Sequence, residues 1–177
     1  QDNQGRTLIF AACEGGKAEI VHNLIELNVD INVPNKENKL PLHVACENKN
    51  PVIVDLIVNN ESNTANINEY WNDMTPLEIA CEKGSIEIVS ILLKKDGIQV
   101  NPTNKKEVPP LLCACEIWRT DIINLLLEKV EDIDVDAAQS DGRTALHYAC
   151  EKGDVSITET ILAKSPNSIN SRTTDKK

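Results

Sequence analysis

The strongest constraint on the fold is the tripeptide Ala-Cys-Glu, which occurs five times in the 177 residues of the chain. The steps between successive copies are 33, 35, 34 and 35 residues. A period held this closely predicts an elongated array of similar units, each in contact only with its neighbours, rather than one or two globular domains. The copies begin at Ala12, Ala45, Ala80, Ala114 and Ala149.

Each unit contains the signals of two short helices. Thr75 can cap the first helix, and with Glu78 it has the form of a capping box. A glycine such as Gly84 then favours a left-handed backbone that ends this helix after about two turns. Apolar residues at i, i+1, i+4 and i+5 predict a second, amphipathic helix, and an extended tetrapeptide such as 29–32 ends the unit. In the third unit the apolar positions are Ile88, Val89, Leu92 and Leu93.

The segments 40–43, 75–78 and 144–147 follow the pattern T-P-L-H-x-A closely, and with their period they resemble ankyrin repeats. This resemblance implies an all-α solenoid of helix-turn-helix units joined by β-hairpin-like finger loops. It also implies recognition of a protein or peptide on a concave face made of fingers and first helices. The expected repeats are 2–34, 35–69, 70–103, 104–138 and 139–171, with 172–177 as the start of a truncated further repeat.

Two further expectations concern the first and fifth repeats. Leu8, Ile9 and Phe10 are apolar, although a terminal repeat usually has a polar outer face. In the fifth repeat, we expect Ile157 and Ile161 to lie on an outer face that a following repeat covers.

The net charge of −10 disfavours nucleic acid and anionic lipid as partners. No apolar run approaches the roughly 20 residues that span a bilayer, so we expect no membrane insertion. The N-terminal sequence also lacks the pattern of a secretory signal.

Five of the six cysteines occupy the same repeat position. Stacked helices lie about 8–10 Å apart, whereas a disulfide needs Cα atoms within about 7 Å. We therefore expect six reduced, buried thiols that act as small apolar side chains. Thiols without disulfides point to a cytoplasmic location, with the nucleus as an alternative.

Catalytic signals are weak. His43 and Cys46, like His147 and Cys150, have the spacing of a Cys-His dyad or of half a zinc site. The equivalent of the histidine is Phe10, Glu78 or Leu112 in the other repeats, so a histidine that bonds its own helix start is the favoured reading. We expect no catalytic, cofactor-binding or metal-binding residue, and no enzyme activity.

A glutamate follows the repeated cysteine in every copy. The five carboxylates could form an acidic stripe that binds a basic partner, or nearby cations could neutralise them in pairs, which we favour. The glutamates are Glu14, Glu47, Glu82, Glu116 and Glu151, and the cations are Arg6, Lys39, Lys83, Arg143 and Lys152.

Both tryptophans occur in the two central repeats. Trp71 and Met74 are in the third finger, while Ile117 and Trp118 follow a first helix, with Trp118 at the turn-glycine position. Exposed tryptophan is enriched at binding hot spots, but local packing explains these residues equally well. The candidate partner-binding residues are Trp71, Met74, Glu82, Glu116, Ile117 and Trp118.

The sequence thus predicts a monomeric, non-catalytic protein-interaction module whose partner is a protein or peptide, with a basic partner as one option. A regulatory or spacing arm of a longer enzyme or channel is the alternative.

Overall fold

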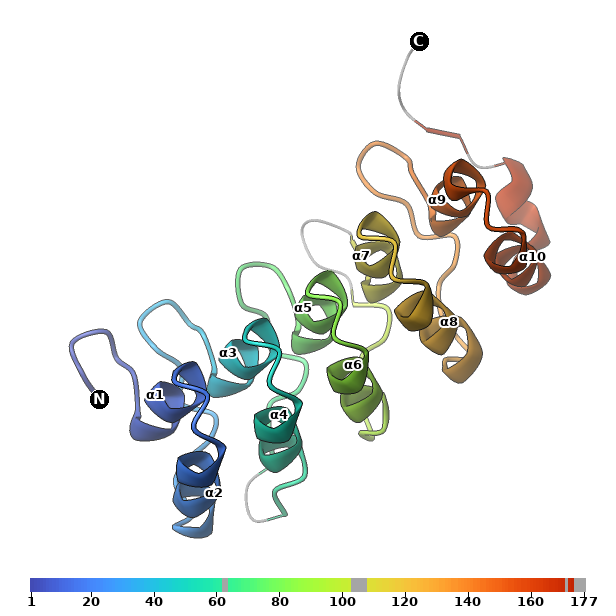
Figure 1. The fold of residues 1–177 in the computed structure, drawn as a ribbon. Helices are drawn as coiled ribbons and strands as arrows, with labels where there is room; N and C mark the ends of the chain where they lie inside the picture. Colours follow the sequence, from blue (N-terminus) through green and yellow to red (C-terminus); the bar gives the residue numbers. More distant parts are fainter. Residues whose placement is uncertain (62–63, 103–107, 171, 174–177) are drawn as a thin grey trace. The chain divides into compact units, whose positions relative to one another are not determined.

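The computed structural model describes residues 1–61, 64–102, 108–170 and 172–173. It divides into two compact units, Gln1–Ile98 and Gln99–Lys177. Every regular element of the described residues is helical, which confirms the all-α fold class (Figure 1). The boundary between the third and fourth expected repeats, near 103–107, and most of the expected further repeat at 172–177 lie outside the described residues.

The first unit contains three helix pairs. These are α1 (Leu8–Glu14) with α2 (Ala18–Glu26), α3 (Pro41–Glu47) with α4 (Pro51–Val58), and α5 (Pro76–Glu82) with α6 (Ile86–Leu93). The first helices α1, α3 and α5 pack in one row and the second helices α2, α4 and α6 in another. The loop before each first helix projects as a finger (Figure 1). We call each finger with its helix pair a repeat, numbered in chain order.

The second unit contains repeats 4 and 5. These are α7 (Pro110–Glu116) with α8 (Thr120–Lys129), and α9 (Ala145–Lys152) with α10 (Val155–Lys164). Helix α7 packs on α9, and α8 packs on α10. A short 3₁₀ helix, η1 (Pro166–Asn170), packs on α10 (Figure 1).

In α3, α5 and α9 the third residue of the first helix accepts a hydrogen bond from the cap residue's amide. In α5 the Thr75 amide donates to the Glu78 carboxylate (2.7 Å), and the Glu78 amide donates to the Thr75 hydroxyl (3.3 Å). In α3 the Leu40 amide donates to Nδ1 of His43 (3.0 Å), as the sequence predicts. Helix α7 starts after Pro109, which has no N–H, so no acceptor is needed at the third position.

The turn after each first helix has one residue in the left-handed region. Gly16, Gly84 and Gly153 have φ of 66°, 69° and 70°. Lys49 and Trp118 occupy the same position with φ of 52° each, so the assignment of Trp118 to the turn-glycine position is confirmed.

The expectation that Ile157 and Ile161 face outward is wrong, because their side chains are only 1% and 0% exposed. Repeat 1 explains why. In repeat 1, Ile20 is the first of the four apolar residues (i, i+1, i+4 and i+5) of the second helix, and it is 51% exposed, while the next residue, Val21, is fully buried. The first apolar position (i) of a second helix therefore faces the second helix of the preceding repeat, which for α10 is α8.

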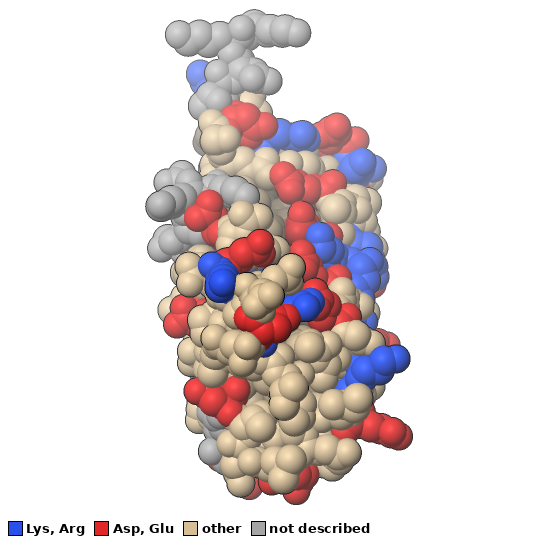
Figure 2. Space-filling model, turned by 90° about the vertical axis from the view of Figure 1, so that its left-hand side faces the viewer, with Lys and Arg blue, Asp and Glu red and all other residues tan. Residues whose placement is uncertain are grey.

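Figure 2 looks onto the α1–α2 side of the first unit and shows a largely uncharged surface there.

The six cysteines form no disulfide, but the expectation that all are buried is wrong for Cys150, which is exposed. Cys13, Cys46, Cys81 and Cys115 at the equivalent position are fully buried. Cys13, Cys46 and Cys115 belong to α1, α3 and α7, and the next first helix, α3, α5 and α9 respectively, packs on each of these helices. No described helix follows α9 in its row, so Cys150 lies at the surface.

Asparagine clasps connect successive repeats. The Asn32 side chain donates to the Thr64 carbonyl (2.8 Å) and accepts from the Asn66 amide (2.9 Å). Asn101 likewise bonds the Asp132 carbonyl (2.7 Å) and the Asp134 amide (2.9 Å). Asn68 donates to the Gly97 carbonyl (2.8 Å) at the equivalent place.

Asp136 occupies the clasp position of repeat 4. A carboxylate can only accept hydrogen bonds, and its partners are donors, the hydroxyls of Ser165 (2.5 Å) and Ser168. This clasp holds the end of α10 and the 3₁₀ helix η1 rather than an extended segment.

Candidate functional site

The candidate surface of the first unit consists of fingers 1 to 3 with the starts and ends of α1, α3 and α5. Fingers 1 and 2 are five-residue loops closed by a hydrogen bond from the Asp2 amide to the Arg6 carbonyl (3.1 Å) and from the Asn35 amide to the Lys39 carbonyl (2.9 Å). The side chains of Asp2 and Asn35 accept further bonds from amides within the loop. Both fingers are thus braced from within.

Finger 3 is tighter. The backbone groups of Trp71 and Met74 exchange two hydrogen bonds, of 2.9 and 3.1 Å, across Asn72 and Asp73. Both central residues have positive φ, 54° and 61°, which is the pattern of a type I′ hairpin turn. The hairpin places Trp71 and Met74 opposite each other at the base of the turn.

Trp71 lies against repeat 2. The Lys39 ammonium is 3.9 Å from the centroid of its ring, and the His43 ring is 6.3 Å away at 42°. The indole is half-buried, so part of it remains at the surface. The local-packing alternative therefore describes a real contact of Trp71, and a cation–π pair fixes the orientation of its exposed part.

His43 is part of the structural support of this surface. Its Nε2 lies 2.8 Å from the Glu69 carbonyl, and its Nδ1 bonds the Leu40 amide. Both ring nitrogens are thus occupied by backbone groups rather than by Cys46. Burial lowers the pKa of His43 to about 4, and burial raises the pKa of the Cys46 thiol. A Cys-His dyad is not formed here.

The repeated glutamates are mostly neutralised, as we favoured. Ion pairs join a finger cation to the glutamate eight residues later in Arg6–Glu14 (2.6 Å), Lys39–Glu47 and Arg143–Glu151. Exposed ion pairs of this kind contribute little to stability, but they neutralise carboxylates that would otherwise form an acidic stripe.

The two central repeats differ at the cation position. Met74 stands eight residues before Glu82, which pairs instead with its neighbour Lys83 (3.4 Å). Val108 stands eight residues before Glu116, whose carboxylate accepts a hydrogen bond from the Gln139 side chain (2.6 Å). Apolar residues thus replace a cation next to these two glutamates.

The six candidate residues fall into two groups. Trp71, Met74 and Glu82 belong to the first unit, while Glu116, Ile117 and Trp118 belong to the second. In the second unit, Ile117 is 44% exposed and Trp118 is half-buried. Each group is therefore a candidate surface of its own unit.

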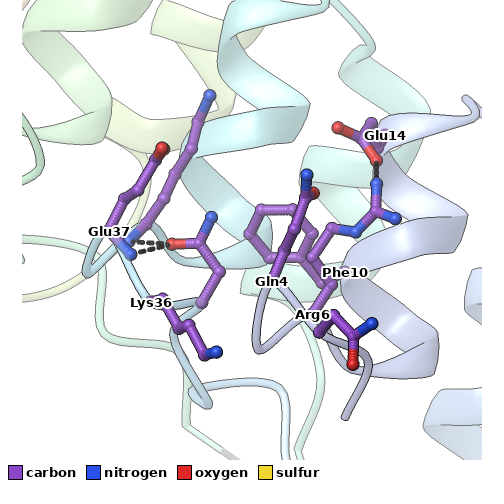
Figure 3. A pocket seen from close by; sticks show the side chains of 9 residues that line it. Gln4, Arg6, Phe10, Glu14, Lys36 and Glu37 are labelled. Carbon is purple, nitrogen blue, oxygen red and sulfur yellow. Dashed lines mark hydrogen bonds and ion pairs between the residues drawn. The ribbon is translucent and has the colours of Figure 1, made fainter.

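A pocket of about 290 Å³ between fingers 1 and 2 was not predicted from the sequence. Figure 3 shows Gln4 and Arg6 from finger 1 and Lys36 and Glu37 from finger 2 around it. Its lining residues are Asn3, Gln4, Arg6, Phe10, Glu14, Asn35, Lys36, Glu37 and Lys39. The abundance of amide and charged residues at the two loop tips was the available signal.

The cationic side chains that line this pocket differ in whether they form ion pairs. Arg6 is bonded to Asp2 and Glu14, and Lys39 to Glu47. Lys36 has no ion-pair partner among the described residues. The pocket therefore offers one available cation beside several amide groups.

Within the part of the chain that the structure describes, no group of three or more His, Cys, Asp or Glu side chains could hold a metal ion. The described helices also include none with the length and apolar character needed to cross a membrane.

The helix pairs, fingers and clasped interfaces are those of a repeat protein, and comparison with known proteins identifies the class. The family described as ankyrin repeats (3 copies) matches residues 8–104 and 98–173. The chain belongs to the ankyrin repeat family. Ankyrin repeats generally mediate protein–protein interaction, and the family is generally non-enzymatic.

Several relatives are similar over much of the chain. The ankyrin repeat protein YahD of Escherichia coli (strain K12) is 30% identical over 168 residues, which cover 92% of this chain and 81% of YahD. The crystal structure of the ankyrin repeat protein EF0377 superposes with a TM-score of 0.80 at 28% identity, covering 92% of this chain and 82% of that one.

Other relatives are much longer. Human transient receptor potential cation channel subfamily A member 1 is 33% identical over 105 residues, 59% of this chain and 9% of the channel. Alpha-latrotoxin-Lg1a of Latrodectus geometricus is 32% identical over 111 residues, 62% of this chain and 8% of the toxin. The chain thus spans less than a tenth of these two proteins.

Proposed function

We propose that the chain is a non-catalytic module that binds a protein or peptide across the fingers and first helices of its first unit. One observation carries the proposal: Lys39 lines the pocket between fingers 1 and 2 and also lies under the ring of Trp71. The pocket and the aromatic surface of finger 3 are therefore continuous.

The side chains of this surface define the partner chemistry. An acidic or amide group of the partner fits the pocket beside Lys36, and an apolar group fits the exposed part of Trp71 and Met74. Glu82 offers a carboxylate near the end of α5 to a basic group. A partner segment with one acidic and one apolar residue is the simplest match, and an entirely basic segment is a poorer one.

A selection of displayed peptides on the immobilised chain, followed by affinity measurements, tests the proposal. We expect Trp71→Ala to weaken binding by about 2 kcal/mol or more, as at buried interface tryptophans. Lys36→Glu should weaken binding of acidic peptides most. Asn59→Ala, at the exposed end of α4, is the control and should bind normally. Binding that survives both finger variants but is lost in the control would refute this surface.

A regulatory or spacing arm of a longer protein is the second candidate. The observation that favours it is the match to a short stretch of a channel, of which this chain spans 9%. In that case the module acts as a monomer joined to other domains, and its thiols suit a cytoplasmic or nuclear location. Peptide selection that yields no binder, with an intact fold, would favour this role.

A further inference from the structure

A second hollow, of about 480 Å³, lies between fingers 2 and 3. Lys39 lines the pocket between fingers 1 and 2, whereas its chain neighbours Asn38 and Leu40 line this hollow, as expected when successive side chains point to opposite sides of an extended segment. The two cavities share no lining residue, so the hollow is a separate feature on the other side of finger 2. Its lining residues are Asn32, Pro34, Asn38, Leu40, Asn66, Glu69 and Tyr70.

Tyr70 occupies a position that has a different role in fingers 1 and 2. It lies five residues before the cap residue of its first helix, as Asp2 and Asn35 do, and those two side chains accept hydrogen bonds from amides within their own loops. Finger 3 is closed instead by the backbone hydrogen bonds between Trp71 and Met74. The tyrosine is therefore not needed to brace its finger, and it lines the hollow while 39% exposed.

The polar side chains of the hollow are available to a ligand. The Glu69 carboxylate forms no ion pair with a described residue. The side-chain amides of Asn38 and Asn66 likewise form no hydrogen bond within the described part of the chain. Burial and, secondly, the charge of Glu78 raise the pKa of Tyr70, so a second carboxylate acts on the same ring. No lysine, arginine or histidine is among the lining residues, and the hollow therefore favours a cation.

The backbone beside the hollow is fixed before a ligand binds. The Glu69 carbonyl lies 2.8 Å from Nε2 of the buried His43. The Trp71 amide donates across the hairpin turn (2.9 Å). Tyr70 is held between these two anchored residues, and such a surface loses less conformational freedom on binding than a mobile loop does.

We propose that this hollow binds an arginine side chain of a partner polypeptide. The planar guanidinium stacks on the Tyr70 ring and donates charge-assisted hydrogen bonds to the Glu69 carboxylate. Its remaining donors match the side-chain oxygens of Asn38 and Asn66. Lysine is a poorer match, because its ammonium is a compact, strongly hydrated charge without a planar face.

The openness of the hollow indicates a polypeptide rather than a free small molecule. Five of its seven lining residues are exposed, whereas sites for small molecules enclose most of the ligand surface. A polypeptide can cover the arginine with its own neighbouring residues. Exposed tyrosine and arginine are also the residue types that carry much of the binding energy at protein interfaces.

The proposal is independent of the proposed function, which uses the opposite side of finger 2. There Lys36 suits an acidic group, whereas here Glu69 suits a basic one. Different variants test the two sites, so the failure of one proposal leaves the other standing.

The test titrates N-acetyl-arginine amide into the isotope-labelled full chain and follows its NMR signals. We expect the side-chain amide signals of Asn38 and Asn66 and the backbone amide of Tyr70 to shift saturably. The citrulline analogue has nearly the same shape without the charge, and it should bind at least about fivefold more weakly. The lysine analogue should bind at least about threefold more weakly than the arginine compound.

Two variants and a matched control locate the site. Glu69→Gln removes the charge, Tyr70→Asn removes the ring, and each should weaken arginine binding at least about fivefold. Both should stay folded, because the two residues are exposed and finger 2 has asparagine at the position of the tyrosine. Glu26→Gln removes an exposed carboxylate on α2, outside the hollow, and should bind arginine normally.

Three results would overturn the proposal. The first is equal affinity for the arginine and citrulline compounds, which would show that the hollow does not select a cation. The second is unchanged arginine binding in both Glu69→Gln and Tyr70→Asn. The third is the absence of a saturable shift at Asn38, Asn66 and Tyr70, whether or not signals such as that of Lys36 on the other side of the finger respond.

Discussion

At the scale of single residues, Cys150 is chemically distinct from the other cysteines. It is exposed, whereas the other five are buried. Burial also raises the pKa of the Cys13 and Cys115 thiols to about 12, so little reactive thiolate forms there. We expect a thiol reagent to label one group rapidly in the native chain and all six after unfolding.

The Cys150→Ser variant is the matched control and should lose the rapid phase entirely. Two or more rapidly labelled thiols in the native chain would show that the first helices open more readily than their burial indicates.

His43 makes the stability of the first unit depend on pH. Its pKa is about 4 in the folded chain, compared with about 6.5 for an ordinary histidine. Below about pH 6.5 the unfolded chain binds a proton that the folded chain does not, so stability falls between about pH 6.5 and 4 by up to about 1.4 kcal/mol per unit. The free energy of unfolding in urea, measured at several pH values, checks this.

His43→Leu serves as the comparison, since Leu112 occupies the equivalent position in repeat 4. The variant loses the bond from the Leu40 amide and should be less stable throughout, but with a weaker dependence on pH. Glu78 acts in the opposite direction, because burial raises its pKa and the folded chain takes up a proton as the pH falls. Equal pH dependence in both proteins would contradict the role of His43.

At the scale of secondary-structure elements, Trp118 places a bulky side chain in a left-handed turn (φ 52°). Trp118→Gly and Trp118→Ala both remove the indole, but only glycine adopts this backbone without strain. We expect the glycine variant to be more stable than the alanine variant by about 1 kcal/mol in urea unfolding.

Lys49 provides the matched pair, because it has the same φ of 52° at the equivalent turn of repeat 2. Lys49→Gly should likewise be more stable than Lys49→Ala. If the alanine variant is the more stable one at both turns, the left-handed assignment is wrong.

The elements themselves could be predicted from local residue types. The capping box of Thr75 and Glu78, the turn at Gly84 and the histidine at the start of α3 all follow from short-range rules. Which side of a second helix faces the preceding repeat and which faces the following repeat could not be predicted, because adjacent apolar residues such as Ile20 and Val21 are equally apolar. The error at Ile157 comes from this ambiguity, whereas the error at Cys150 arises because no described first helix follows α9.

The candidate surface was predicted less completely than the fold. Trp71 was identified from its residue type, but its contact with Lys39 depends on how two repeats stack. The pocket between fingers 1 and 2 joins Gln4 and Lys36, which are distant in sequence, so the composition of each loop tip marks the residues but not that they line one pocket. Neutralisation of the repeated glutamates by nearby cations was predicted, and Arg6 with Glu14 is one of the pairs that the structure forms.

At the scale of the whole molecule, the arrangement within the first unit predicts a gradient of local stability. Helix α4 is packed between α2 and α6, whereas among the described helices α2 has a second-row neighbour on one side only. Since repeat stability is approximately a sum of interface contributions, amides of 51–58 should exchange more slowly than those of 18–26. Hydrogen exchange on the unmodified chain measures both segments, and equal protection would contradict the gradient.

The clasps determine where the number of repeats can change. Asn32, Asn68 and Asn101 donate to main-chain carbonyls of the next repeat, and Asn32 and Asn101 also accept from its amides, so these bonds need no particular side chain there. A gene duplication or deletion of one whole repeat ahead of 101 would therefore leave partners for these asparagine hydrogen bonds in place. Asp136 instead requires hydroxyl donors, and a repeat inserted behind it would need serines like Ser165 and Ser168. Growth and loss of the array are thus easier on one side of the chain than on the other.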